Sequence, residues 1–543
     1  MLRKISLTLA LLALMVVSIV PSITQASFTP YYGKEYSQPE QVLKLYPEPD
    51  VEFHSPAFEK EEKQFTTQEE MMAFLRQLDE KSNLVEMKVI GESIEGRKIP
   101  MLVFNKGAHT KNKPTVWLQA QIHGNEPAAG ESALVMANKL SGEFGEKILD
   151  KVNVIIVPRV NPDGSYYYQR RTANGLDANR DHIKLELQEN RAVHRALKKF
   201  HPEVVIQAHE YGVPYFPEVG NQGGLTYHDI TLLTGRNLNI PEKIRNMANE
   251  LYIGNTLDTL TDEGFSSRTY YYPVGRKDGK TIIQEGGTDP RIGRNAFGLQ
   301  PSFSFLVESR GIGIGRENFK RRVAGQITSH MSILETTADN AKKIKKIVFK
   351  AKKHIVKNGR KADDNDKIVV ESKRKVFPNE TLTVVDTEKG ETVEIPVIYY
   401  SSLHSIPTLV RERPTAYIVP PEYEEVAEKL KIQGVEVKRL RKPVTLEVEG
   451  YTVTEQNIAD EAYEGHYLNN VETEITTKKV HFPKGSYVYS MAQPQANLIA
   501  VTLEPESNDS YVTFNYIPAD LGDQIPVYRY MQQKQLNVST VKE

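Results

Sequence analysis

The chain has 543 residues, of which 39% are apolar and 26% are charged, so it has enough apolar side chains for a large folded core. Its 69 Lys and Arg residues nearly balance its 70 Asp and Glu residues, and this balance gives no indication of nucleic-acid binding. The absence of cysteine excludes disulfides, a cysteine nucleophile and thiolate metal sites. Any metal ion must therefore be held by His, Asp or Glu.

The N-terminal residues 1–26 have the pattern of a secretory signal peptide. Two basic residues precede an apolar run at 7–20, and Ala26 offers a small residue for cleavage. A membrane anchor is the alternative, but the run is short for a spanning helix, which needs about 20 apolar residues. We expect a secreted, extracellular protein, with cell-wall association as an option, and no stable membrane span after removal of the signal.

A catalytic α/β domain is predicted at 65–340, after an N-terminal surface segment at 27–64. Apolar strand-like runs alternate here with helical patterns, and a capping pattern at 66–70 predicts the start of the first helix. The clearest strands are near-continuous apolar runs, as expected for strands with helices on both faces of the sheet. These strands are 115–121, 152–157, 204–208 and 303–307.

A helical stretch between Glu317 and Lys357 follows, with apolar residues mainly three and four positions apart. Its basic part, 341–361, is interpreted as a solvated helical linker rather than as a surface for anionic partners. Short apolar runs separated by Pro, Gly and Asn then predict a smaller, mostly β domain at 362–543. Within it we expect a strand at 496–504, and a strand, a helix and a strand over 415–440.

Four candidate ligand or catalytic side chains come directly after predicted strands. His123 and Glu126 lie three residues apart where a helix begins, so both can reach one ion, although this spacing alone is a weak signal. His209 and Glu308 follow two other strands. Because ligands bind outside the carboxyl ends of strands in an open α/β sheet, all four are expected at one edge. A core histidine and a salt-bridged carboxylate are the alternatives for His209 and Glu308.

Two histidines and one carboxylate leave a fourth position open on a tetrahedral zinc ion, which is the pattern of a catalytic site. That position would hold water, and a carboxylate that does not bind the metal is then needed as general base; Glu308 meets this need. Arginine and asparagine side chains between the metal candidates suggest recognition of an anionic chain end and stabilisation of an oxyanion. For any one arginine, pairing with a local acid is the alternative. The cluster contains Arg170, Arg171, Asp177, Asn179 and Arg180.

Five motifs, in this order, resemble the signature of zinc carboxypeptidases of the carboxypeptidase A type. They are HGNE at 123–126, NPDG at 161–164, GLDANRD at 175–181, His209, and FLVESRG at 305–311. The resemblance covers about residues 65–335. It implies a bacterial, secreted metallocarboxypeptidase, a hydrolase with a mixed central sheet and helices on both faces. It also implies one Zn²⁺ per chain and a peptide substrate with a free C-terminal carboxylate.

The resemblance also assigns roles by position. It implies that His123, Glu126 and His209 are the zinc ligands and that Glu308 is the general base. Arg170, with Arg171 as a rival, corresponds to the arginine that polarises the scissile carbonyl. Asn179 and Arg180 correspond to the pair that binds the terminal carboxylate, and Asp177 to an acid that orients the first histidine ligand.

The chain also departs from the family pattern. The stretch before Glu308 lacks the family's substrate-covering tyrosine, and the nearest tyrosines are at 270–272. Arg291 and Arg294 occupy this stretch instead, where they either recognise extra negative charge on the substrate or pair within the loop. Two alternative functions stay open: hydrolysis of cell-wall peptides with γ-D-glutamyl or D-residue linkages, and peptide binding by an inactive homologue.

Overall fold

The structure is a computed structural model that describes residues 33–35, 37–60, 64–107, 110–362 and 366–541. The predicted signal peptide lies outside these residues. Within them, no helix is both long enough and apolar enough to cross a membrane.

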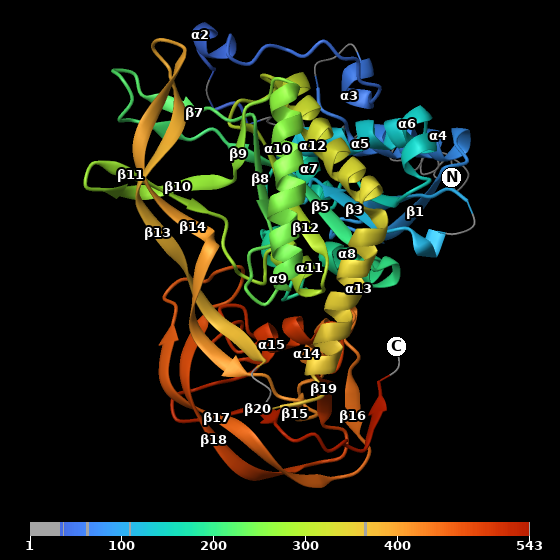
Figure 1. Cartoon of the computed structure of the whole chain (residues 1–543), viewed down its shortest axis with the longest axis vertical. Coiled ribbons are helices and arrows are strands. Elements are labelled where there is room, and N and C mark those ends of the chain that lie inside the picture. Colours follow the sequence, from blue (N-terminus) through green and yellow to red (C-terminus); the bar gives the residue numbers. More distant parts are fainter. Residues whose placement is uncertain (1–32, 36, 61–63, 108–109, 363–365, 542–543) are drawn as a thin grey trace, which may run out of the picture. The chain divides into compact units, whose positions relative to one another are not determined.

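A mixed sheet lies at the centre of the predicted α/β region, in the order β1-β2-β4-β3-β5-β12-β8-β9 (Figure 1). The four strands predicted from apolar runs, β4, β3, β5 and β12, are neighbours and run parallel, whereas β1, β2 and β8 pair antiparallel. The predicted mixed sheet is therefore confirmed. Its strands are β1 (Val85–Glu92), β2 (Lys98–Phe104), β3 (Thr115–Ala120), β4 (Asn153–Val157), β5 (Val204–Gly212), β8 (Ile230–Thr234), β9 (Ser267–Thr269) and β12 (Phe303–Ile312).

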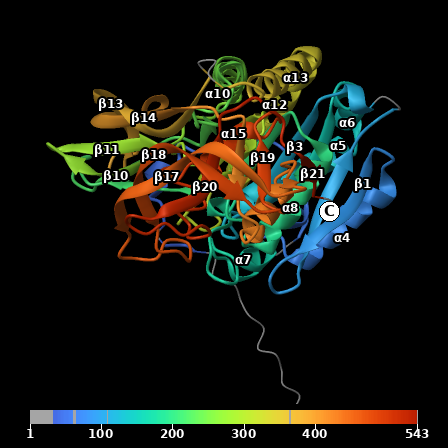
Figure 2. The same cartoon turned by 90° about the horizontal axis from the view of Figure 1, so that it is seen from below.

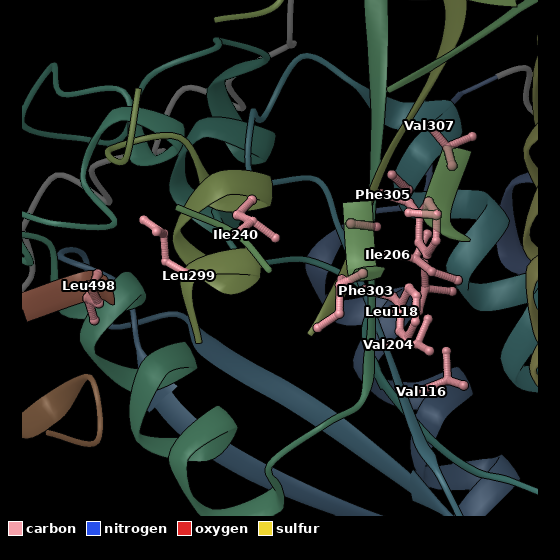
Figure 3. Packing of buried hydrophobic residues seen from close by; sticks show 14 of the residues in the cluster. Val116, Leu118, Val204, Ile206, Ile240, Leu299, Phe303, Phe305, Val307 and Leu498 are labelled. Carbon is pink, nitrogen blue, oxygen red and sulfur yellow. The ribbon is translucent and has the colours of Figure 1, made fainter. Parts of the chain in front are cut away.

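Helices cover both faces of this sheet. Because successive side chains of a strand point to opposite sides, a continuous apolar strand presents apolar residues to both faces. Leu118 of β3 lies beside Ile206 of β5, which in turn lies beside Phe305 of β12, in the core shared with α5 (Pro127–Leu140) and α12 (Phe319–Asp339) (Figure 3). Trp117 points to the other face, toward α8 (Gln188–Phe200) and α11 (Gly293–Leu299). Both faces of the strands are thus dry, which explains their continuous apolar sequence.

The helix predicted from the capping pattern at 66–70 is α4 (Gln68–Lys81), and its capping box is formed by Thr67 and Glu70. The helical stretch predicted at 317–357 is divided into α12 and α13 (Ala341–Asn358). The break falls at Asn340, whose backbone leaves the helical region and whose side chain donates to Thr336 O. The other helices are α2 (Glu40–Leu43), α3 (Pro56–Glu59), α6 (Glu143–Ile148), α7 (Pro162–Tyr167), α9 (Glu242–Met247), α10 (Gly254–Asp262), α14 (Glu424–Ile432) and α15 (Ala496–Leu503).

A second sheet takes strands from both sides of position 362, the boundary that the sequence suggested. The long β14 pairs in parallel with β11, and β13 pairs antiparallel with β7. All the described residues also fall in one compact unit. A separate domain at 362–543 therefore stays a prediction. The strands of this sheet are β10 (Tyr271–Lys277), β11 (Lys280–Glu285), β14 (Glu391–Glu412), β13 (Lys367–Asp386), β7 (Gly224–Thr226) and β6 (Tyr215–Phe216).

A third sheet, nearest the viewer in Figure 2, is antiparallel throughout its described pairs. The strand, helix and strand predicted over 415–440 are confirmed as β15, α14 and β16. The strand predicted at 496–504 is wrong: this segment forms the fully buried helix α15, because a short run that is apolar on all sides fits a buried helix as well as a strand. The sheet contains β18 (Asn469–Phe482), β17 (Val444–Ile458), β20 (Gln524–Tyr530), β15 (Ala416–Val419), β19 (Tyr487–Ser490), β16 (Lys438–Leu440) and β21 (Val538–Thr540).

Candidate metal centre and substrate pocket

The turn from β3 to α5 positions the first two candidate ligands. Gln121, directly after β3, has a φ of 47°, a left-handed conformation that is uncommon for a residue with a side chain. Its side chain holds this turn, since Nε2 donates to Gly124 O at 3.1 Å and Oε1 accepts from Arg159 Nε at 2.7 Å. Glu126 then immediately precedes α5, whose first residue is a proline.

The HGNE and NPDG motifs pack directly against each other. A Cβ on Gly124 would lie 1.8 Å from the carbonyl carbon of Gly164, so only glycine allows this approach. The NPDG segment includes the start of α7, and Asn161 caps that helix by accepting from Gly164 N at 2.8 Å. The two motifs therefore form one structural unit next to the candidate ligands.

The structure brings His123, Glu126 and His209 together, with one ligand atom of each within 4.8 Å of the others. His123 Nδ1 lies 2.6 Å from Glu126 Oε1, and His209 Nδ1 lies 2.9 Å from Glu126 Oε2. Burial alone would raise the pKa of Glu126, but the two histidines lower it to about 2, so the carboxylate is ionised. Two imidazole nitrogens and a carboxylate form a donor set that fits zinc.

Asp177 lies behind the first histidine, with its Oδ1 3.1 Å from His123 Nε2. Burial opposes its ionisation, yet His123, Arg170 and Arg180 hold its pKa well below the usual value. This ionised carboxylate fixes the outer nitrogen of His123, so that Nδ1 faces the other ligand atoms.

Of the two rival arginines, Arg170 lies beside the candidate ligands. Its Nη1 is 3.2 Å from His123 Nδ1 and 3.7 Å from Glu126 Oε1. Arg171 instead forms an ion pair with Glu464, at 2.9 Å.

Asn179 and Arg180 are held by the short helical turn η2 (Ala178–Arg180). Asn179 Nδ2 lies 3.5 Å from His209 Nε2, and Asn179 Oδ1 accepts from Gly293 N at 3.0 Å. Arg180 Nη1 donates to Asn179 O at 2.9 Å. Both side chains line the pocket into which His123 opens.

Glu308 lies on β12 at the position paired with His209 on β5, so adjacent parallel strands place both side chains at one edge. It lines the same pocket, of about 700 Å³, together with His123 and Arg170. Burial and the nearby Glu126 raise its pKa well above the usual value, despite the opposing charge of Arg170.

Three further residues at the site were not assigned a role from the sequence. Glu210, directly after His209, accepts from Ala128 N at 2.6 Å and pairs with Arg322 at the same distance, so it holds the start of α5. In the sequence, the position of Glu210 directly after His209 was the feature that could have indicated a role at the site. Tyr463 and Glu464 come from the loop between β17 and β18: Tyr463 lines the pocket, and Glu464 Oε2 accepts from Asp177 N at 2.7 Å.

The tyrosines at 270–272 also line the pocket. Burial raises the pKa of Tyr270 strongly, and the carboxylate of Glu308 adds to this effect, so the Tyr270 hydroxyl lies within electrostatic range of Glu308. A tyrosine thus reaches the pocket from a segment that precedes the stretch in which the family pattern places one.

Known proteins that are similar to this chain identify its family. A zinc carboxypeptidase family model matches residues 71–203. Carboxypeptidase 2 of Trichophyton rubrum is 32% identical over 474 residues, which make up 86% of each chain. The chain belongs to the zinc carboxypeptidase family. The family expected from the sequence motifs is therefore confirmed.

Further matches to this carboxypeptidase cover less of the chain. Carboxypeptidase A2 of Mus musculus is 35% identical over 95 residues, which are 17% of this chain and 22% of that protein. The crystal structure of the carboxypeptidase A from Helicoverpa armigera is 16% identical and covers 56% of this chain and 80% of its own, with a TM-score of 0.40. The long match to a fungal carboxypeptidase gives no support to the bacterial origin expected from the sequence.

Proposed function

We propose that this carboxypeptidase is a secreted exopeptidase that releases the C-terminal residue of peptides. One observation carries the proposal: His123 of the candidate metal cluster lines the same pocket as Asn179 and Arg180. An arginine and an amide beside a metal centre can hold a terminal carboxylate while the adjacent peptide bond lies near the metal.

Export is inferred from the signal-like residues 1–26 alone. A secreted form that begins after Ala26 would support export, and retention of residues 1–26 would contradict it.

The proposed roles follow from where the side chains lie. His123, Glu126 and His209 would hold one zinc ion, which supplies a Lewis acid for the scissile carbonyl and lowers the pKa of a water molecule. Glu308 takes a proton from the attacking water and passes it to the leaving amine. Its raised pKa makes the carboxylate a stronger base toward that water.

Four other residues support this chemistry in the proposal. Arg170, beside His123 and Glu126, stabilises negative charge that develops on the carbonyl oxygen. Asp177 keeps His123 in one orientation through its outer nitrogen. Asn179 and Arg180 bind the terminal carboxylate and so set which peptide bond is cleaved.

The direct test compares two peptides that differ only in a free or an amidated C-terminus. Because amidation removes the charge that Arg180 would bind, we expect kcat/KM to fall by about 100-fold or more on the amidated peptide. Equal rates would contradict the exopeptidase proposal. Faster cleavage of peptides with a γ-D-glutamyl linkage would favour the cell-wall alternative, and peptide binding without any cleavage would favour the inactive homologue.

A further inference from the structure

Arg294 is a buried cation of the candidate substrate pocket that forms no ion pair with the residues that the structure describes. It lies near the start of α11, is 3% exposed, and lines the pocket with Glu308. Its Nη2 donates to Gly287 O at 2.6 Å, and its Nε has no hydrogen-bond acceptor among the described residues. Burial lowers the pKa of Arg294 to about 10, and the charge of Arg236 adds to this effect.

The neighbouring arginines are compensated by carboxylates of the protein. Arg291 pairs with Asp509 and, at 3.6 Å, with Asp289; Arg236 lies 3.7 Å from Glu285. In the described part of the chain, no such ion pair includes Arg294, although Asp289 acts on it at longer range. A buried charge without a partner destabilises a fold, so Arg294 is suited to pair with an anionic group of a ligand.

The position of Arg294 identifies the part of the ligand that it faces. The residue before it, Gly293, donates to the side chain of Asn179, which the proposed function assigns to the terminal carboxylate. Arg294 is also within electrostatic range of Arg180 and of Glu308. Arg294 therefore lies next to the place where Asn179 and Arg180 would hold a C-terminal residue.

The guanidinium of Arg294 packs against the backbone of a glycine. A Cβ on Gly286 would lie 2.7 Å from Arg294 Nη2, so the guanidinium rests directly against a residue that has no side chain. Gly286, Gly287 and Arg294 all line the pocket. A planar guanidinium in this position can form two parallel hydrogen bonds with a carboxylate.

We propose that Arg294 selects an acidic side chain at the C-terminal position, so that the preferred substrates are peptides ending in Glu or Asp. This inference rests on the proposed exopeptidase function. Arg294 acts on specificity, whereas Asn179 and Arg180 bind the α-carboxylate that every such peptide carries.

The test uses the zinc-loaded full chain and three peptides that are identical except for a last residue of Glu, Gln or Leu. For the wild type we expect kcat/KM on the Glu peptide to exceed that on the Gln peptide by about 100-fold. Arg294→Gln should remove this preference by slowing the Glu peptide alone, and Arg294→Lys, which keeps the charge, should retain part of it. Because Arg294→Gln removes an unpaired buried charge, its unfolding midpoint without substrate should be equal to or above that of the wild type.

Three results would overturn the inference, each in a different way. Equal wild-type rates on the Glu and Gln peptides would show that no acidic side chain is selected. A uniform loss on all three peptides in a folded, zinc-loaded Arg294→Gln variant would assign Arg294 to the α-carboxylate. No release from any peptide by the wild type would contradict the proposed exopeptidase function, and the inference would fall with it.

Discussion

Asp177 connects three parts of the candidate site through a single carboxylate. Its Oδ1 lies 3.1 Å from His123 Nε2 and accepts from Asn179 N at 2.8 Å, and its Oδ2 lies 2.9 Å from Arg170 Nη2. This one side chain therefore orients a predicted zinc ligand, the predicted carbonyl-polarising arginine and the predicted carboxylate-binding turn.

At the residue scale, we expect Asp177→Asn to weaken zinc binding by about 10- to 100-fold, because loss of such a partner leaves the histidine ligand less basic and less fixed. Competition with a metal chelator measures this change. Asp181→Asn is the matched control, since Asp181 is a buried aspartate of the same segment whose carboxylate accepts from Glu186 N and Leu187 N instead. Equal zinc affinity in both variants would contradict the role of Asp177.

At the scale of elements, the apolar strands explain why much of the site could be predicted. His209 and Glu308 follow continuous apolar runs, and parallel strands buried on both faces must end at one edge of the sheet. The left-handed backbone of Gln121 could not be predicted, because it depends on contacts with Arg159 and Gly124 that form only in the fold. Helix α15 was missed because its buried surroundings, and not its periodicity, determine its structure.

The packing of α12 on α5 includes a buried histidine. His330 of α12 is fully buried, and its Nε2 lies 3.2 Å from Ser132 Oγ on α5. Ser132 donates its hydroxyl hydrogen to Ala129 O, which leaves His330 Nε2 to donate to the serine oxygen. His330 Nδ1 has no partner among the described residues, so a second proton there would be buried and unsatisfied.

This contact predicts a contribution of His330 to acid sensitivity. Burial lowers the pKa of His330 from 6.5 to about 3, so between these values the unfolded chain binds the proton and the folded chain does not. Above pH 6.5, His330 therefore does not change the free energy of unfolding. As the pH falls below 6.5, His330 lowers the free energy of unfolding by up to about 1.4 kcal/mol per pH unit. Chemical unfolding of wild type and His330→Gln should show a shallower slope for the variant between pH 4 and 6, and parallel curves between pH 7 and 8. Parallel curves over the whole range would contradict this assignment.

At the scale of the whole molecule, the third sheet contributes to a site whose candidate ligands lie in the first half of the chain. Glu464, in the loop between β17 and β18, binds Asp177 N and Arg171, and its own carbonyl accepts from Lys184 Nζ at 2.8 Å. Tyr463 beside it lines the pocket, with its ring 5.0 Å from the guanidinium of Arg291. The sequence could not predict this contact, because Asp177 and Glu464 are 287 positions apart and neither segment indicates the other.

We expect Glu464→Gln to lower kcat/KM by about 10-fold with zinc content unchanged, because a hydrogen bond to a charged group contributes about 1.5–3 kcal/mol. Steady-state rates and metal analysis on the same preparation measure both quantities. Glu461→Gln is the control, since Glu461 is an exposed glutamate of the same loop. If the two variants have the same activity, the loop does not support the site.

We propose that Glu308 is the general base beside a zinc ion that His123, Glu126 and His209 would hold. The most direct measurement is zinc content together with the rate of C-terminal residue release in Glu308→Gln. Because Glu308 does not bind the metal in this account, the variant should retain one zinc ion per chain and lose activity by about 10²- to 10⁴-fold, the usual contribution of general acid–base catalysis. A zinc-loaded variant as fast as the wild type would contradict the account.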